Sequence, residues 1–349
     1  MPLSEEKRNQ IKKYILEQIK YNNVNIAKKT ALNFNISIQT AYRYISQLVN
    51  EGTVKKNENG KYELIRLVNK KYKYDLSSKE DIQEDIVFRE TLAPFIKKFN
   101  KNTYTIWEYS FTEMVNNVID HSEAKNLEIY IGQDALNTWV NIIDDGIGIF
   151  KKISEYYHYN DLEDAMVSLF KGKLTTDNEN HSGEGIFFTS RVMDWFGAIS
   201  SNKLFLQEHT HESVRDLGDG SYSKKIESFK NSKGTVIVMV LTNDTNRTLK
   251  EVFDMYSSVD GGFTITNIPM KRICDSGYPV SRSQAKRLYF GFEKFEKVIL
   301  DFNGVDEIGQ GFAHELFNVF QKKHPEIKME CINTNDAINK MIAHVQKGM

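Results

Sequence analysis

The sequence predicts a multi-domain α+β protein, and three observations along the chain support this prediction. The first third begins with short amphipathic helices and a basic hairpin, the middle interleaves helices and strands around glycine-containing segments, and the last third follows a β-α-β-α order. A chain of 349 residues is long enough for two or three domains. We therefore expect domains at residues 1–66, 85–260 and 261–349, with a connector at residues 67–84.

Charge and cysteine content narrow the class of protein. Residues 1–66 carry 12 Lys and Arg against 6 Asp and Glu, whereas the remainder carries 34 against 41. A basic end on an acidic body suggests contact with nucleic acid, although a solvated basic surface has the same composition. Cys274 and Cys331 lie far apart without metal-ligand spacing, which fits a reducing cytoplasm. The sequence shows no signal peptide and no apolar run of membrane-spanning length, so we expect a cytoplasmic protein without a membrane partner.

The N-terminal segment predicts three helices and a hairpin. Isoleucines recur at every fourth position from Ile11 to Ile19, which gives one apolar helix face. A second short helix follows, and Ser37 is placed to cap a third. Two alternating segments at residues 53–56 and 61–65 flank an Asn-Gly turn, the strongest short hairpin signal.

This arrangement resembles a winged helix-turn-helix domain, in which the third helix enters the major groove of duplex DNA and the wing lies along the phosphates. The resemblance implies DNA contacts from Gln39, Thr40, Arg43 and Gln47 on the helix and from Lys55, Lys56 and Lys61 on the wing. A winged helix used only for protein contacts remains the alternative.

Four segments in the middle of the chain are the most specific signals. In order they are Glu113-Met-Val-Asn-Asn117, Asp144-Asp-Gly-Ile-Gly148, Ser182-Gly-Glu-Gly-Ile186 and Gly234-Thr-Val236. The ordered set is similar to the nucleotide-binding boxes of the GHKL ATPases, the family of histidine-kinase catalytic domains, Hsp90, MutL, gyrase B and the anti-sigma-factor kinases. The resemblance covers about residues 85–245 and implies an α/β sandwich that binds ATP with Mg²⁺.

The first two boxes supply the candidate catalytic and adenine-binding residues. Glu113 and Asn117 share one helix face because they are four residues apart. The amide oxygen of Asn117 is a neutral hard ligand suited to Mg²⁺, and the Glu113 carboxylate can deprotonate a nucleophile. The family's pattern implies these roles, and it makes Asp144 the acceptor for the adenine amino group. His121 continues the same helix face toward a phosphate or the helix end, and Asn116 is a weaker substitute for Asn117.

The resemblance also assigns the remaining residues of the nucleotide site. Asp145 stands where many relatives have Asn and is open to a role at the metal or a phosphate. The residues assigned to the nucleotide are Gly146 and Gly148 beside the base, Lys173, Gly183 and Gly185 near the phosphates, and Thr235 near adenine. Residues 150–182 are long and polar, so we expect a mobile lid with little apolar surface to bury.

Two further elements are expected between the lid and the last box. A helix following Gly185 should run to Trp195 and end at Gly197, and residues 203–232 should form a hairpin. Gly172-Lys173 lacks the spacing of a P-loop. No helix with a phospho-acceptor histidine precedes the first box, which argues against a sensor histidine kinase.

The C-terminal third resembles a STAS-like domain. The expected order is a helix at 281–288, a strand at 298–302, a helix from Ala313, a strand at 328–332 and a last helix from Asp336. Related anti-sigma antagonists carry a phosphorylatable serine after the first strand, whereas this chain has Gln310 and Gly311 there. We therefore expect a module for contacts with a protein partner rather than a phosphorylation switch.

Three functions fit these motifs. The first is an ATP-binding regulator whose nucleotide controls DNA binding or transcription through the winged helix and the STAS-like module. The second is an anti-sigma-type serine/threonine kinase acting in trans, and the third is a clamp in which ATP drives formation of a homodimer. A nucleotide site alone does not separate them, because one fold hosts many functions.

Overall fold

The computed structural model describes residues 3–21, 24–77, 82–159, 161–173, 183–208, 233–258, 262–272 and 278–347. The chain forms two compact units, of which the first contains residues 1–148 and 190–247 and the second contains residues 149–189 and 248–349. This division differs from the expected boundary at residue 260. Residues 149–189 belong to the same compact unit as the C-terminal elements, and the N-terminal module shares a unit with the central sheet.

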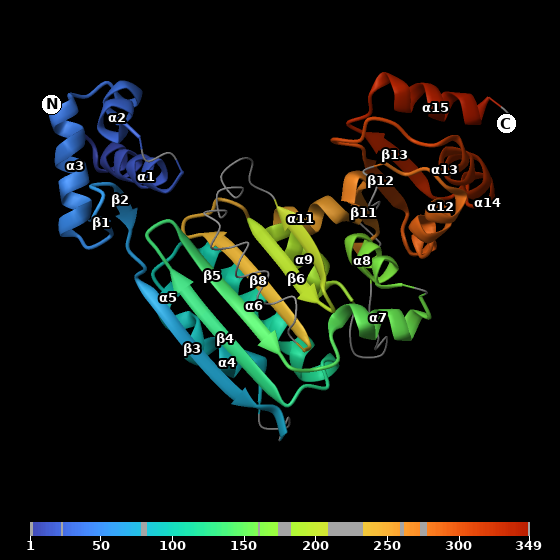
Figure 1. Cartoon of the computed structure of the whole chain (residues 1–349), viewed down its shortest axis with the longest axis horizontal. Coiled ribbons are helices and arrows are strands. Elements are labelled where there is room, and N and C mark those ends of the chain that lie inside the picture. Colours follow the sequence, from blue (N-terminus) through green and yellow to red (C-terminus); the bar gives the residue numbers. More distant parts are fainter. Residues whose placement is uncertain are drawn as a thin grey trace. The chain divides into compact units, whose positions relative to one another are not determined.

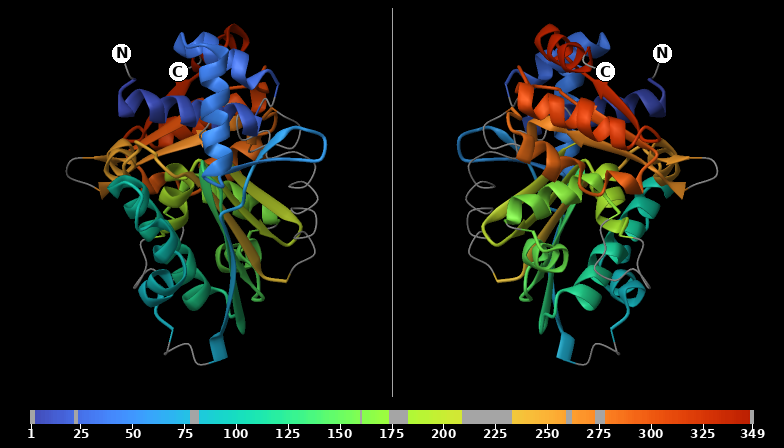
Figure 2. Two further views of the ribbon diagram at one scale, coloured as in Figure 1. Left: turned by 90° about the vertical axis from the view of Figure 1, so that its left-hand side faces the viewer. Right: turned by 90° about the vertical axis from the view of Figure 1, so that its right-hand side faces the viewer.

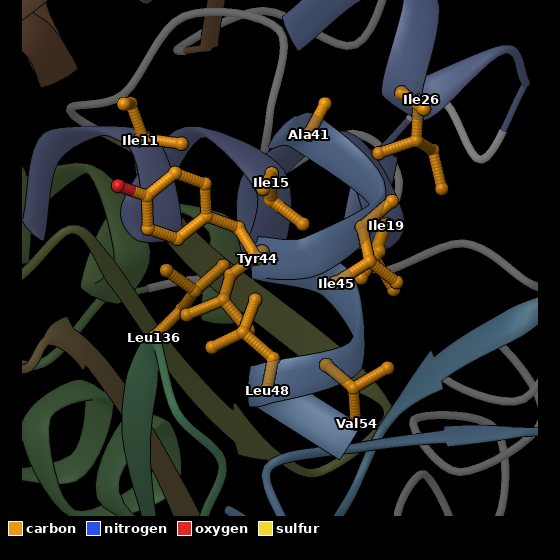
Figure 3. Close-up of a cluster of buried hydrophobic side chains, with 12 residues drawn as sticks. Ile11, Ile15, Ile19, Ile26, Ala41, Tyr44, Ile45, Leu48, Val54 and Leu136 are labelled. Carbon is orange, nitrogen blue, oxygen red and sulfur yellow. The ribbon is translucent and has the colours of Figure 1, made fainter. Parts of the chain in front are cut away.

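The N-terminal module contains the three helices and the hairpin that the sequence predicts. They are α1 (Glu5–Tyr21), α2 (Ile26–Phe34), α3 (Ile38–Asn50), β1 (Val54–Lys56) and β2 (Tyr62–Leu64), and the two strands pair antiparallel. Ser37 caps α3 by accepting a hydrogen bond of 3.0 Å from the Thr40 amide. The helices enclose an apolar core in which α1 contributes three isoleucines, shown in Figure 3.

The first unit is built on a six-stranded sheet whose order is β3-β4-β5-β8-β6-β7, with every neighbouring pair antiparallel. The strands are β3 (Val68–Asp75), β4 (Asn126–Gln133), β5 (Asn137–Asp144), β6 (Trp195–Ser200), β7 (Lys203–Glu208) and β8 (Thr235–Thr242). The helices of this part are α4 (Glu84–Thr91), α5 (Ala93–Ile96) and α6 (Lys101–His121). Helices α4 and α6 lie on one face of the sheet (Figures 1 and 2), and α6 packs against β5 and β8.

Two strands replace elements that the sequence suggested. The segment expected as a connector holds β3, an edge strand whose Lys71 and Lys73 both pair with Glu128 of β4. An edge strand needs little apolar surface, so the charged sequence of β3 did not indicate a strand. The helix expected to reach Trp195 ends instead at Val192, because the fully buried segment that follows forms β6.

The hairpin expected at residues 203–232 begins earlier. Strands β6 and β7 are joined by a turn at Ser201 and Asn202, which both have positive φ angles. Such backbone angles at both central residues are typical of a tight hairpin turn. Residues 209–232 lie outside the described residues.

The second unit contains a three-stranded parallel sheet with β12 at its centre. Its strands are β11 (Ile265–Pro269), β12 (Lys297–Asp301) and β13 (Lys328–Ile332), and a short pair is formed by β9 (Ser257–Ser258) and β10 (Gly262–Phe263). Its helices are α7 (Ile149–Tyr157), α8 (Leu162–Lys171), α9 (Gly185–Val192), α11 (Leu249–Tyr256), α12 (Arg282–Tyr289), α13 (Gln310–His314), α14 (Gln321–Lys323) and α15 (Asp336–Gln346), with α9 crossing the unit boundary. A π-helical segment (Glu315–Phe320) joins α13 to α14, and 3-10 turns occur at Met270–Arg272 and Phe292–Lys294.

The C-terminal β-α-β-α order is confirmed. Helix α12 begins with a capping box between Ser281 and Gln284, and α15 begins beside Asn335, whose side chain accepts a hydrogen bond of 3.0 Å from the Ile338 amide. The additional strand β11 pairs with β12 and enlarges the expected sheet. The structure is thus a mixed α+β protein.

Candidate nucleotide site

Helix α6 positions the first two candidate residues against the sheet. Glu113 and Asn117 are half-buried on a helix whose apolar face packs on β5 and β8. The amide nitrogen of Asn117 is fully buried and has no hydrogen-bond partner among the described residues. Buried polar groups are almost always paired, so this N–H group is open to an acceptor, whereas the amide oxygen is the atom that a cation would need. His121 is the last residue of α6 and is also half-buried.

Asp144 is a buried acid of the first unit whose pKa is strongly raised. It ends β5, is 4% exposed, and accepts a hydrogen bond of 2.8 Å from the Gly146 amide. Burial raises the pKa of its carboxyl to about 6, and hydrogen bonds from the backbone of Gly146 and from the amide and hydroxyl of Thr235 hold it from rising further. A buried carboxylate held by neutral donors is poised for an additional donor, and perturbed pKa values of this kind gather at functional sites.

The structure brings Thr235 to Asp144, although they lie far apart in the chain. Thr235 begins β8, and β8 pairs with β5 so that Val236 lies opposite Ile143. The second and fourth sequence boxes therefore meet at one end of two adjacent strands. Their order in the chain predicted this meeting only through the family resemblance.

Two glycines allow the loop after Asp144 to fold tightly. A Cβ atom at Gly146 would overlap the carbonyl oxygen of Ser122, and one at Gly234 would lie 2.6 Å from the Gly146 nitrogen. Gly234 also has a φ angle of +75°, which side chains rarely adopt. Gly148 is held in the same loop beside Ser200. These glycines are required by the close approach of three backbone segments, whatever else they contact.

Asp145 has a different role from the one left open by the sequence. Its carboxylate accepts hydrogen bonds from the amides of Lys125 and Asn126, both at 2.9 Å, and from the Asn126 side chain at 2.7 Å. Burial acts to raise its pKa, but these hydrogen bonds outweigh burial and lower it. Both carboxylate oxygens tie this loop to the start of β4, so a role at a metal or phosphate is not supported.

The three phosphate-side candidates lie in the second unit. Gly183 has a φ angle of +68° and Gly185 is the first residue of α9, as the glycine-before-helix pattern predicts. Lys173 donates a hydrogen bond of 2.9 Å to the Lys294 carbonyl and lies over the rings of Phe263 and Phe295. Desolvation lowers the pKa of Lys173. Its ammonium group is thus engaged by the C-terminal part of the chain.

The expected lid is largely helical where it is described. Residues 149–171 form α7 and α8 apart from a short connection, and Phe150, Ile153, Ala165 and Leu169 are buried. The expectation of little apolar surface is therefore wrong for this part, because apolar residues recur at helical spacing between the polar ones. Residues 174–182, which include Asp177, Asn178, Asn180 and His181, lie outside the described residues.

The candidate DNA-contacting residues are mostly exposed. Gln39, Arg43 and Gln47 project from α3, and the hairpin exposes Lys55, Lys56 and Lys61. Thr40 is half-buried, and its hydroxyl lies 2.9 Å from the Ser37 hydroxyl at the helix cap. Its position favours a structural role over contact with a base.

One attachment between the N-terminal module and the sheet was missed by sequence reasoning. Leu136, in the β4–β5 turn, is 6% exposed and completes the core of the N-terminal module (Figure 3). Beside it, the Lys20 ammonium lies 3.1 Å from the carboxylate of Asp134, and Lys13 lies 2.8 Å from Asp244. The only sequence signal was an apolar residue within a turn.

The loop that carries a phosphorylatable serine in the related antagonists is closed here by backbone contacts. The Gly309 amide donates to the Pro279 carbonyl at 2.8 Å, and the Phe312 amide donates to the Val280 carbonyl at 3.1 Å. A Cβ atom at Gly309 would overlap the Val280 backbone. These amides at the start of α13 are therefore already hydrogen-bonded.

Comparison with known proteins supports the C-terminal interpretation. Residues 284–339 match the family described as a STAS-like domain of unknown function (DUF4325). No curated protein matches the chain significantly. In the described ranges, no helix is both long enough and apolar enough to cross a bilayer. Nor do the described residues gather three or more His, Cys, Asp or Glu side chains into a group that could hold a metal ion.

Proposed function

We propose that this chain is an ATP-binding regulatory protein in which nucleotide controls DNA binding by the N-terminal module. The observation that carries the proposal is Asp144, a buried carboxylate with a raised pKa beside Thr235 at the end of β5. Asn117 lies half-buried on helix α6, and its buried amide N–H group has no partner among the described residues. The resemblance of the four boxes to the GHKL ATPases supports the choice of ligand.

In this proposal each residue of the first unit has one task. Asp144 accepts the adenine amino group, Asn117 supplies a ligand for Mg²⁺, and Glu113 takes a proton from the attacking group. Bound Mg²⁺-ATP supplies the transferable phosphoryl group. The order of boxes in the sequence supports these tasks, and the burial of Asp144 supports a hydrogen-bonding role for it.

Isothermal calorimetry with Mg²⁺-ATP tests the nucleotide assignment. Asp144→Ala removes an acceptor from the adenine amine, which should cost about 1–3 kcal/mol of binding free energy. GTP is the matched control ligand, because its purine carries an oxygen where adenine carries the amine and should bind poorly to the parent protein. Equal affinity of the parent and Asp144→Ala for ATP would show that the adenine assignment is wrong.

The DNA part of the proposal rests on charge and exposure. Arg43 and three hairpin lysines are exposed on a module that carries twice as many basic as acidic residues. Removing one phosphate contact with Lys55→Ala should flatten the log-log salt dependence of binding by about 0.9. Arg43→Ala should instead reduce the preference for particular sequences. Absence of binding to duplex DNA at low salt would leave this module as a protein-contact domain.

A protein kinase acting in trans is the second candidate, because the four boxes also resemble those of the anti-sigma-factor kinases and the C-terminal part matches a STAS-like family. Incubation with ATP labelled on the γ-phosphate separates the candidates. Free labelled phosphate supports an ATPase, label transferred to an added protein supports a kinase, and neither product supports a nucleotide sensor. A dimer that forms only with ATP would support the clamp.

A further inference from the structure

The end of helix α8 is embedded in the C-terminal part of the second unit. Lys171 is only 4% exposed, and its ammonium donates hydrogen bonds to the carbonyls of Arg287 at 3.1 Å and Phe290 at 2.8 Å. These carbonyls lie at the end of α12, where helical carbonyls lack intrahelical partners and the helix dipole favours a cation. Lys171 therefore completes the C-terminal end of a STAS-like helix.

The backbone of Lys171 and the two residues that follow it, Gly172 and Lys173, also contact the C-terminal elements. The Lys171 carbonyl accepts a hydrogen bond of 2.7 Å from the buried Thr266 hydroxyl on β11. Gly172 has a φ angle of +79°, and a Cβ atom there would lie 2.7 Å from the ring of Phe263. Lys173 is bound to the Lys294 carbonyl, so three consecutive residues are fixed by the C-terminal elements.

A second set of contacts holds the rest of the segment. The buried carboxylate of Asp164 lies 2.9 Å from the Arg287 guanidinium, and the ring of Tyr159 meets Phe290 edge to face at 5.8 Å. Helices α7 and α8 pack on each other, and α8 packs on β11 beside it in Figure 1. Separating this segment would break the hydrogen bonds of Lys171, the contact of Thr266 with the Lys171 carbonyl and the Asp164–Arg287 ion pair, and it would expose aromatic rings to water.

We infer that α7–α8 and the STAS-like domain respond to nucleotide as one body, with Lys171 as the residue that joins them. The inference rests on the proposed nucleotide binding and adds its output: α7 begins at Ile149, directly after the Asp144–Gly148 segment in the chain, and α8 supports the end of α12. The contacts of Lys171, Gly172 and Lys173 mean that a displacement of α8 carries α12 and β11 with it. Lys171 is a positioning residue and needs no contact with the nucleotide.

Hydrogen exchange of the full chain, with and without Mg²⁺ and a non-hydrolysable ATP analogue, tests this inference. In the parent protein the analogue should slow exchange in α6 and in the STAS-like elements α12 and β12. Lys171→Met should keep the nucleotide effect in α6 and lose it in the STAS-like elements. Lys151→Met is the matched control, because Lys151 is an exposed lysine of α7 and its loss should leave both effects intact.

The possible outcomes distinguish a failure of the coupling from a failure of the proposed nucleotide binding. No change anywhere, together with no heat of binding, refutes both nucleotide binding and the coupling. Protection confined to α6 in the parent, or protection of α12 that persists in Lys171→Met, refutes only the coupling. If Lys171→Met does not fold, Arg287→Gln provides the second variant, since it breaks the ion pair with Asp164 from a half-exposed position and should weaken the response of α12.

Discussion

Replacing Asp144 with asparagine should stabilise the first unit while weakening ATP binding. Burial raises the pKa of Asp144 from 3.8 to about 6. A raised carboxyl pKa means that the folded protein binds the proton more tightly than the unfolded chain, so stability falls as pH rises from about 4 to about 6. The difference of roughly two pKa units corresponds to about 3 kcal/mol at neutral pH.

The asparagine side chain in the Asp144→Asn variant would mimic the protonated acid and avoid this cost, although it loses part of the acceptor capacity that Gly146 and Thr235 use. Subtracting about 1 kcal/mol for a weakened hydrogen bond leaves a net gain of about 1–2 kcal/mol above pH 6. Below pH 4 both side chains are neutral, so the gain should disappear. ATP affinity should fall at the same time, because a neutral amide is a weaker acceptor than a carboxylate.

Urea denaturation followed by tryptophan fluorescence measures this unit selectively, because Trp107, Trp139 and Trp195 all lie in it. Asp145→Asn is the matched control with the opposite sign. Its carboxylate has a lowered pKa, so it stabilises the protein above the unfolded pKa and loses that contribution in acid. A loss of stability for Asp144→Asn at pH 7.5, or a difference from the parent that does not change between pH 4 and 7, would refute the reasoning.

Three other perturbations have definite expected results. Glu113→Ala should abolish ATP turnover in a phosphate-release assay while calorimetry still detects ATP binding. Asn117→Ala should also lose the dependence of ATP binding on Mg²⁺. Unchanged turnover in Glu113→Ala would exclude Glu113 as the base. Burial lowers the pKa of Lys171 from 10.5 to about 7, against the opposing effect of Asp164. The free energy of unfolding of the parent should therefore rise between pH 7 and pH 10, by up to about 1.4 kcal/mol per pH unit. Circular-dichroism melts measure this slope, which Lys171→Met should lack. Leu136→Ala should lower the free energy of unfolding by about 2–4 kcal/mol and speed proteolysis of the N-terminal module. Leu67→Ala, at an exposed position, should do neither. Equal proteolysis of the two variants would contradict the role of Leu136.

The elements that the sequence predicted well carry their own end signals. Ser281 and Gln284 form a capping box at α12, and Asn335 caps α15, so both helix starts could be located without tertiary information. Strand β3 was missed because its pairing with β4, rather than any apolar alternation, defines it. The segment at Trp195 was taken for helix because apolar residues on every side are compatible with either a buried helix or a buried strand.

In the candidate site, too, the contacts between residues distant in sequence could not be predicted from the sequence alone. The sequence alone could place Glu113 and Asn117 on one helix face, because four residues make about one turn. It could not show that Asp144 meets Thr235, since that depends on β8 inserting between β5 and β6 in the sheet. Nor could spacing reveal that Lys173 faces the C-terminal domain or that Asp145 fastens a loop, because both facts depend on carbonyls and amides distant in sequence.

Strand β5 connects the two ends of the first unit at which we propose DNA binding and nucleotide binding. Leu136 lies immediately before the strand, in the core of the N-terminal module, and Asp144 is its last residue. Eight strand residues span about 26 Å, and β5 is hydrogen-bonded to β4 on one side and β8 on the other along this length. A strand paired on both edges is stiff, so a ligand that shifts Asp144 along the strand must either move the β4–β5 turn or break ladder hydrogen bonds. Because that turn is anchored by Leu136 and by the ion pair between Lys20 and Asp134, the less costly response is a displacement of the module that presents α3.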